Sequence, residues 1–207
     1  MRPSRVPQNA LQLLVCSLKP GPQASSSEVM ARQVLDAMAD HGVAGDTLRV
    51  ADYDVKPGTA ADMGEGDQWP QIRSRIYDAD ILVFATPTWV GHPSSVAQRV
   101  LERLDAELSE TDDQGRPELF GKVAVVAVVG NEDGAHKIVA DSFQALNDMG
   151  FTIPAGGATY WNSEAMNPVD YKDLDQTPEP VAATTATLGR NAAHLARVLG
   201  AQQYPAS

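Results

Sequence analysis

The sequence predicts an open, doubly wound α/β sheet, and two observations carry this prediction. Short apolar runs alternate with amphipathic stretches, which is typical of consecutive βαβ units around a parallel sheet. Each of about five predicted strands is followed by a predicted helix, with no internal repeat and no long linker. A chain of 207 residues is long enough for one sizeable core, so we expect a single domain over residues 1–207.

The first βα unit is predicted over the N-terminal quarter of the chain. The apolar run at residues 10–16 is the first strand. Ser25 and Glu28, three residues apart, form the pattern of a capping box at the start of a helix that Gly42 ends. Residues 47–50 form a short second strand.

The middle of the chain repeats this alternation. A Pro/Gly-rich loop at residues 56–66 precedes a helix predicted over residues 67–77. The continuous apolar run at residues 81–85 is typical of a central parallel strand covered on both faces. A stiff loop, residues 86–93, then leads into a helix whose apolar stripe extends to Leu104.

The strongest strand pattern lies at residues 123–129, after a polar stretch. The turn at residues 130–134 leads into the next helix, and a last strand is predicted within residues 151–161. The final helix carries an apolar side between Leu188 and Leu199, which suits either the core or a subunit interface.

Composition excludes several classes of function. The formal charge of −11 repels phosphate backbones and anionic lipid, so we expect no nucleic-acid partner and no membrane insertion. The one cysteine, Cys16, cannot form an internal disulfide or a thiolate metal cluster. The N-terminal stretch lacks an apolar signal core, and we expect a cytoplasmic protein.

Ligands of such sheets bind outside the carboxyl ends of the strands, and the first loop there is rich in serine. Ser17 follows the first strand, and Ser25, Ser26 and Ser27 start the next helix. Helix N-terminal N–H groups and hydroxyls bind anions and suit a terminal phosphate monoester. Neither GxxxxGK[ST] nor GxGxxG is present, which argues against an NTPase or a pyrophosphate site. The alternative is an ordinary serine cap beside a flexible loop.

The second loop, residues 86–91, places Trp89 between Pro87, which fixes φ, and Gly91, which permits close approach to a ligand. An indole beside main-chain donors suits a flat heteroaromatic ring. The alternative is a tryptophan that closes the edge of the core.

The third loop combines glycines, carboxylates and an imidazole. Gly130 and Gly134 let backbone amides face a ligand, and Asp133 with His136 could form a proton-transfer or metal pair. The alternative, acidic residues that favour a helix N-terminus, is the simpler one, and we predict no metal site. His136 is the one candidate for a catalytic proton donor, with a purely structural hydrogen bond as its alternative.

Three stretches together resemble the flavodoxin-like superfamily, in its branch of NADPH-dependent FMN reductases and NAD(P)H:quinone oxidoreductases. Residues 17–27 resemble the family's phosphate loop, residues 79–91 (ADILVFATPTWVG) its third strand and flavin loop, and residues 128–136 (VVGNEDGAH) its last flavin loop. The resemblance implies a five-stranded parallel sheet in the order 2-1-3-4-5 between two helical layers. Many members have an arginine in the phosphate loop, where this chain has Lys19.

Carried over by position, the resemblance implies FMN-binding roles in all three loops. The phosphate is expected at Ser17, Lys19, Ser25, Ser26 and Ser27, the ribityl chain and ring edge along Pro87, Thr88, Trp89, Val90 and Gly91, and the pyrimidine side of the ring beside Gly130, Asn131, Glu132, Asp133, Gly134 and His136.

The function that this resemblance implies is an FMN-dependent NAD(P)H oxidoreductase. NAD(P)H gives a hydride to flavin N5 and leaves, and an acceptor such as a quinone or free flavin then takes the electrons. Backbone N–H groups around Trp89 and Gly134 are expected to stabilise the negative charge of the reduced ring. The family implies a homodimer or homotetramer. The alternatives are a flavodoxin-type electron carrier without nicotinamide turnover and a binding module that has lost FMN.

Residues 160–162 and the long loop at residues 162–180 are expected near the flavin or at a subunit contact. The acidic residues Glu164, Asp170, Asp173 and Asp175 leave a solvated surface as the alternative.

Overall fold

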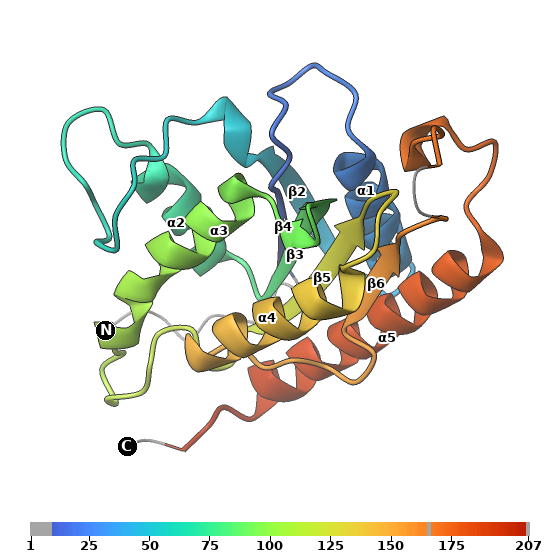
Figure 1. Ribbon diagram of the computed structural model, residues 1–207. Coiled ribbons are helices and arrows are strands. Elements are labelled where there is room, and N and C mark those ends of the chain that lie inside the picture. Colours follow the sequence, from blue (N-terminus) through green and yellow to red (C-terminus); the bar gives the residue numbers. More distant parts are fainter. Residues whose placement is uncertain (1–9, 165–166, 206–207) are drawn as a thin grey trace.

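A parallel sheet forms the centre of the computed structural model, which describes residues 10–164 and 167–205 (Figure 1). Its strands lie in the order β2-β1-β3-β5-β6, and every neighbouring pair is parallel. Their bounds are β1 Ala10–Val15, β2 Ala44–Arg49, β3 Ile81–Trp89, β5 Val123–Val129 and β6 Ala158–Trp161. The predicted order is therefore confirmed, and each predicted strand is present.

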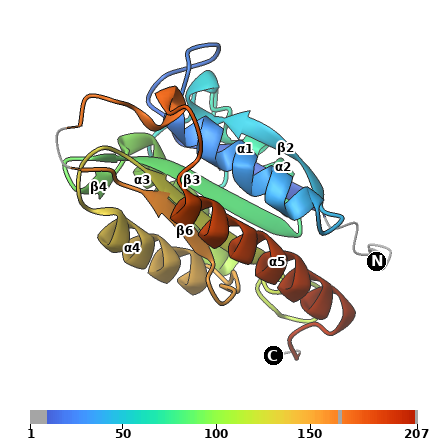
Figure 2. The same ribbon diagram turned by 90° about the vertical axis from the view of Figure 1, so that its right-hand side faces the viewer.

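Helices cover both faces of the sheet (Figures 1 and 2). Helices α1 (Ser26–Ala39) and α5 (Glu179–Ala201) pack on one face. Helices α2 (Trp69–Asp78), α3 (Ser95–Leu104) and α4 (Ala135–Asp148) pack on the other. Three 3-10 turns, η1 (Val50–Asp52), η2 (Asp105–Ser109) and η3 (Tyr171–Asp173), lie in the connections. In the described residues, none of the helices combines the length and the apolar character that a membrane crossing needs.

The core consists of two apolar layers, one on each face of the sheet. All seven residues of β5 are buried. Because successive side chains of a strand point to opposite faces, Val126 packs with α2, α3 and α4, whereas Val125 packs with α1 and α5. Both faces of the strand are therefore apolar, which explains the unbroken run of Val and Ala in the sequence.

One predicted loop is in fact regular structure. Strand β3 continues through Trp89, and a two-residue strand, β4 (His92–Pro93), pairs antiparallel with its end. The prediction of a stiff loop over residues 86–93 is wrong, and the sheet has six strands instead of five. Pro87 misled the prediction, although the β3–β5 pairing runs through it to Val129.

Helix α1 begins at the predicted serine cap, but only one half of the predicted capping box is formed. Ser25 is the N-cap, and its Oγ accepts a hydrogen bond from the N–H of Glu28 at 3.4 Å. The Glu28 carboxylate does not complete the capping box, because it pairs with Arg32 and Arg49. Burial raises the pKa of Glu28, but its hydrogen bonds to the two guanidinium groups outweigh this and hold the pKa below its ordinary value.

The apolar side of α5 belongs to the core. Leu188, Ala192 and Leu199 are buried against α1 and the sheet. The sequence left open whether this side serves the core or a subunit interface, and the structure shows that it serves the core.

Candidate functional site

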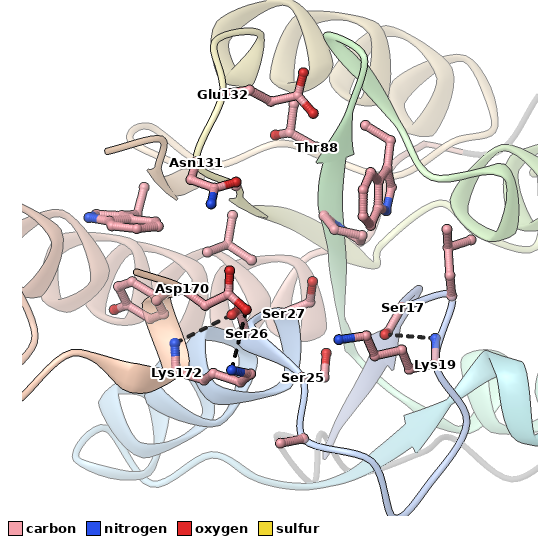
Figure 3. Close-up of a pocket in the computed structure, with 18 residues that line it drawn as sticks. Ser17, Lys19, Ser25, Ser26, Ser27, Thr88, Asn131, Glu132, Asp170 and Lys172 are labelled. Atoms are coloured by element: carbon pink, nitrogen blue, oxygen red, sulfur yellow. Dashed lines mark hydrogen bonds and ion pairs between the residues drawn. The ribbon is translucent and has the colours of Figure 1, made fainter. Parts of the chain in front are cut away.

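A cleft opens at the carboxyl ends of β1, β3 and β5, beside the point where the strand order reverses (Figure 3). The loops after β1 and β5, the ends of β3 and β5 and the first residues of α1 supply most of its lining, and the end of β6 and the segment around η3 supply the rest. The lining residues are Ser17, Leu18, Lys19, Ala24, Ser25, Ser26, Ser27, Pro87, Thr88, Trp89, Val129, Gly130, Asn131, Glu132, Trp161, Asp170, Tyr171 and Lys172.

Four serines gather at one end of the cleft, as the sequence predicts. Ser17 directly follows β1, and Ser25, Ser26 and Ser27 form the start of α1. Within the described residues, the backbone N–H groups of Ser26 and Ser27 have no hydrogen-bond acceptor. Free N–H groups at a helix N-terminus attract an anion.

The serine hydroxyls are set up as donors. Ser17 Oγ accepts from the N–H of Lys19 at 3.1 Å, Ser25 Oγ from that of Glu28, and Ser26 Oγ from that of Lys172 at 3.3 Å. In the described part of the chain none of the three donates its own proton. A hydroxyl whose oxygen already accepts a backbone N–H has its O–H left to give. This end of the cleft therefore suits a ligand that only accepts hydrogen bonds, such as a phosphate.

The Arg49 side chain fixes the serine-rich loop, residues 17–25, by hydrogen bonds to its main chain. Its guanidinium donates to the carbonyl oxygens of Lys19, Pro20 and Gln23, and pairs with Glu28 at the first turn of α1. The side chain is buried. Three carbonyl dipoles are thereby directed at one cation. Arg49 itself does not line the cleft, and the sequence analysis missed it because the contact joins the end of β2 to a loop about 30 residues earlier.

The segment 170–172 closes the serine end from the opposite side (Figure 3). The Lys172 ammonium pairs with Asp170 and Asp173, and these hydrogen bonds raise its pKa. The long loop was expected near the site, but these residues were not singled out. Tyr171 is held by a hydrogen bond to Gln33 of α1 at 2.6 Å, a contact without a local sequence signal.

The other end of the cleft lies beside the turn between β3 and β4. Trp89 lines the cleft and is 49% exposed. Val90 and Gly91 have φ values of 54° and 72°, the pattern of a type I′ hairpin turn. Asparagine and glycine favour this turn, whereas positive φ is strained for a β-branched residue by about 1–3 kcal/mol.

Glu132 binds this turn. Its two carboxylate oxygens accept hydrogen bonds from the N–H of Val90 at 3.0 Å and of Gly91 at 3.3 Å. The N–H of Gly134 donates to the Asp133 carboxylate at 2.7 Å. Each of these three amides already donates to a carboxylate in this structure. The expectation that backbone N–H groups around Trp89 and Gly134 stabilise a reduced ring stays a prediction.

Several predicted site residues lie beside the cleft and do not line it: Val90, Gly91, Asp133, Gly134 and His136. Gly134 has a packing role, since a Cβ at this position would meet the Cα of Gly91 at 2.8 Å. The two flavin loops of the prediction thus contact each other backbone to backbone.

His136, the catalytic candidate, is exposed and bound elsewhere. Its Nε2 lies 2.8 Å from the hydroxyl of Tyr160, and the two rings meet edge to face. In residues 10–164 and 167–205 the structure shows no hydrogen bond between Asp133 and His136, the pair that the sequence left possible, and no three His, Cys, Asp or Glu side chains gather into a possible metal site. Of the two roles that the sequence left open for His136, the structure shows the structural hydrogen bond, to Tyr160.

The lining fits FMN in two further respects. The hydroxyl of Thr88 is buried in the wall and has no partner in the described residues. Gly130 is packed so closely that a Cβ would meet Thr88 Cβ at 2.8 Å, so the main chain itself forms this wall. The phosphate of FMN accepts hydrogen bonds, and the serine end of the cleft presents donors. The ring of FMN is flat, and the indole of Trp89 presents an apolar surface for it.

Residues 11–165 match the model of the NADPH-dependent FMN reductase family, which is most of the chain. The chain belongs to this family. The resemblance seen in the sequence is thereby confirmed.

Two curated relatives match the chain. The 8-demethyl-8-aminoriboflavin-5'-phosphate synthase of Streptomyces davaonensis is 28% identical over 158 residues, which are 72% of this chain and 62% of the relative. The divalent metal cation transporter MntH of Mycobacterium bovis is 35% identical over 161 residues, which are 76% of this chain and 24% of the relative. The chain therefore spans less than two thirds of the length of either relative.

Solved structures confirm the flavodoxin-like fold of this FMN reductase family member. RosB with bound 8-demethyl-8-formylriboflavin-5'-phosphate superposes with a TM-score of 0.84 at 27% identity, over 94% of this chain and 81% of RosB. A flavone reductase gives 0.69 at 15% identity, over 95% of this chain and 65% of its own. A flavodoxin of Streptococcus pneumoniae gives 0.57 at 18% identity, over 89% and 98%.

Proposed function

We propose that the chain is an FMN-dependent NAD(P)H oxidoreductase of the flavin or quinone reductase type. The observation that carries the proposal is the set of three hydroxyls, on Ser17, Ser25 and Ser26, whose oxygens each accept a backbone N–H and whose protons are left to donate. They surround two free N–H groups at the start of α1. Membership of the NADPH-dependent FMN reductase family supports the choice of ligand and of electron donor.

When bound, FMN supplies the redox chemistry, taking a hydride from NAD(P)H and passing two electrons to an acceptor such as a quinone or free flavin. The protein binds and orients. The serines and the N-terminus of α1 hold the phosphate, with Lys19 and Lys172 as nearby cations. Trp89, at the other end, offers an apolar face to the ring.

Two measurements test the proposal. Calorimetric titration is expected to show tight binding of FMN and weaker binding of riboflavin, which lacks the phosphate. Stopped-flow mixing of the FMN-loaded protein with NADPH or NADH is expected to bleach the flavin absorbance. Absence of FMN binding would exclude a flavoprotein, and binding without bleaching would favour an electron carrier.

A serine variant sharpens the binding measurement. Ser26→Ala removes one donor to a charged acceptor, so we expect the Kd for FMN to rise about tenfold, corresponding to roughly 1.5 kcal/mol. The Kd for riboflavin is expected to stay unchanged. Ser95→Ala, on the exposed face of α3 and away from this cleft, is the matched control.

A second candidate function follows from the RosB comparison. That structure holds a modified riboflavin phosphate as an intermediate, and it superposes on 94% of this chain. The same cleft could then hold FMN as a substrate to be altered. Mass spectrometry of the flavin recovered after turnover distinguishes the two: an unchanged mass supports the oxidoreductase, and a changed mass supports flavin modification.

A further inference from the structure

The turn between β3 and β4 is held from outside by one carboxylate. Glu132 accepts the N–H groups of both central turn residues, Val90 at 3.0 Å and Gly91 at 3.3 Å. Val90 cannot hold the turn by packing, because its side chain is 84% exposed. The turn requires a positive φ at Val90, which is unfavourable for a β-branched residue. The two hydrogen bonds that Glu132 accepts therefore act with the β3–β4 pairing to fix the conformation of the turn.

The loop that carries Glu132 is built to reach this turn. Gly134 has a φ of 130° and no side chain, which allows its main chain to lie against that of Gly91. The side chain of Asn131 donates to the carbonyl of Asn167 at 2.8 Å and anchors the loop on its other side. Glu132 is thus directed at the turn by the residues before and after it.

Glu132 also gives its end of the cleft a negative charge. The two cations that line the cleft, Lys19 and Lys172, belong to the serine end, where they neighbour Ser17 and Ser26. Among the described ion pairs none involves Glu132. Its partners are neutral amides, which stabilise a carboxylate and leave its charge in place.

We propose that Glu132 is a positioning residue that fixes the Trp89–Gly91 turn and, through its charge, lowers the affinity of the cleft for reduced flavin relative to oxidised flavin. This inference rests on the proposed function, since it concerns the ring of an FMN bound in the same cleft. A fixed negative charge beside a ring opposes the addition of further negative charge to it.

The redox part is tested with Glu132→Gln, which removes the charge at nearly constant shape. We expect the ratio of the Kd for oxidised to the Kd for reduced FMN to rise about tenfold, which for a two-electron couple raises the midpoint potential by about 30 mV. Glu102→Gln, which removes an equal charge from α3 outside this cleft, is the control and is expected to leave the potential unchanged. An unchanged potential in Glu132→Gln overturns this part of the proposal.

The positioning part is tested without flavin. Hydrogen exchange of individual amides in the apo protein is expected to be at least tenfold faster at Val90, at Gly91 or at both in Glu132→Gln. An amide side chain offers one acceptor oxygen where the carboxylate offers two, so at least one turn amide loses its acceptor. The amide of Val126, in the centre of β5, reports whether the variant remains folded. Unchanged exchange at both turn amides overturns the positioning role.

The two readouts separate this inference from the proposed function. If the wild-type protein binds no FMN, the proposed function and the redox role of Glu132 both fail, while faster turn exchange still supports the positioning role. If FMN binds and is bleached by NAD(P)H but neither readout changes in Glu132→Gln, the proposed function stands and this inference fails.

Discussion

At the scale of single residues, the turn at Val90 shows a local preference overruled by its surroundings. A β-branched residue has a positive φ here, with its side chain in solvent. The site that surrounds it depends on the turn, since Trp89 lines the cleft and Glu132 binds the next two amides. Strain of this kind persists where the neighbouring structure fixes it.

We expect Val90→Asn to stabilise the protein by about 1 kcal/mol, because asparagine tolerates positive φ and little apolar burial is lost. Thermal unfolding would then shift upward by about 2–4 °C. Val169→Asn, another exposed valine without a positive φ, is the control and should change stability by less than about 0.5 kcal/mol. Equal effects of the two substitutions would refute the strain at Val90.

Residue types in the sequence predicted the serine end of the cleft better than the ring end. Serine has few roles at a helix start, and Ser25, Ser26 and Ser27 line the cleft as expected. Asp133, Gly134 and His136 come from an equally suggestive motif, but they serve the loop itself and the Tyr160 contact. The motif at residues 130–136 showed which residue types are present, but the conformation of the loop determines which of them face the cleft.

At the scale of elements, Arg49 joins β2, the serine-rich loop and α1. The guanidinium satisfies three carbonyls and one carboxylate at once, which a planar fork of five donors can do and an ammonium cannot. The loop is thus fixed before any ligand arrives.

We expect Arg49→Lys to raise the Kd for FMN about tenfold, because the lysine keeps the charge but leaves loop carbonyls unpaired and the loop less ordered. Riboflavin affinity should change less than about twofold, since the phosphate end is not used. Arg32→Lys is a matched control, as Arg32 pairs with the same Glu28 without contacting the loop. Parallel loss of affinity for both flavins by titration calorimetry would contradict the prediction.

The helices and parallel strands were predictable because their signals are local. The strand at residues 123–129 has the predicted bounds, and α1 starts at its predicted serine cap. Strand β4 escaped prediction because two residues, one of them a proline, carry no periodicity. The η3 segment escaped because Gln33 and Tyr171, 138 residues apart, decide its position.

At the scale of the whole molecule, a buried ion pair ties the long connection before α2 to α3. The side chains of Asp67 and Arg103 have no exposed surface, and their charged groups lie 2.8 Å apart. Burial raises the pKa of Asp67, but the hydrogen bond from Arg103 and three backbone N–H groups outweigh it and hold the pKa well below its ordinary value. Arg103 also donates to the carbonyls of Lys56 and Ala60.

We expect Asp67→Asn to destabilise the protein by about 3–5 kcal/mol at pH 7, because it leaves the buried Arg103 without its counter-charge. Since folding lowers the pKa of Asp67, its contribution is fully present above its unfolded pKa of about 4 and is lost as pH falls toward the folded pKa. The difference between wild type and variant in urea unfolding should therefore shrink below about pH 4.

The Asp112–Arg116 pair, whose side chains are 28% and 18% exposed, supplies the comparison. Asp112→Asn is expected to change stability by less than about 1 kcal/mol at pH 7. A similar loss in both variants would show that burial of the Asp67 pair is unimportant.

The alternation of strands and helices was enough to predict a parallel, doubly wound sheet, whereas the order of its strands was implied by the family resemblance. The alternation does not determine how the connecting segments contact one another at the carboxyl ends of the strands. Asn131 and Asn167 are 36 residues apart in the sequence, and Arg49 and Lys19 are 30 apart, yet each pair is hydrogen-bonded in the fold.

The two apolar layers on the faces of the sheet also bear on how this protein can change over generations. Their packing involves strand and helix interiors, whereas the polar groups of the cleft stand on strand ends, turns and the first residues of α1. Substitutions in those connecting segments can alter which flavin is accepted, or what is done with it, while the folding of the scaffold proceeds as before. Because the cleft residues and the core residues are largely separate, substitutions in the cleft can change the chemistry of the protein at little cost in folding stability.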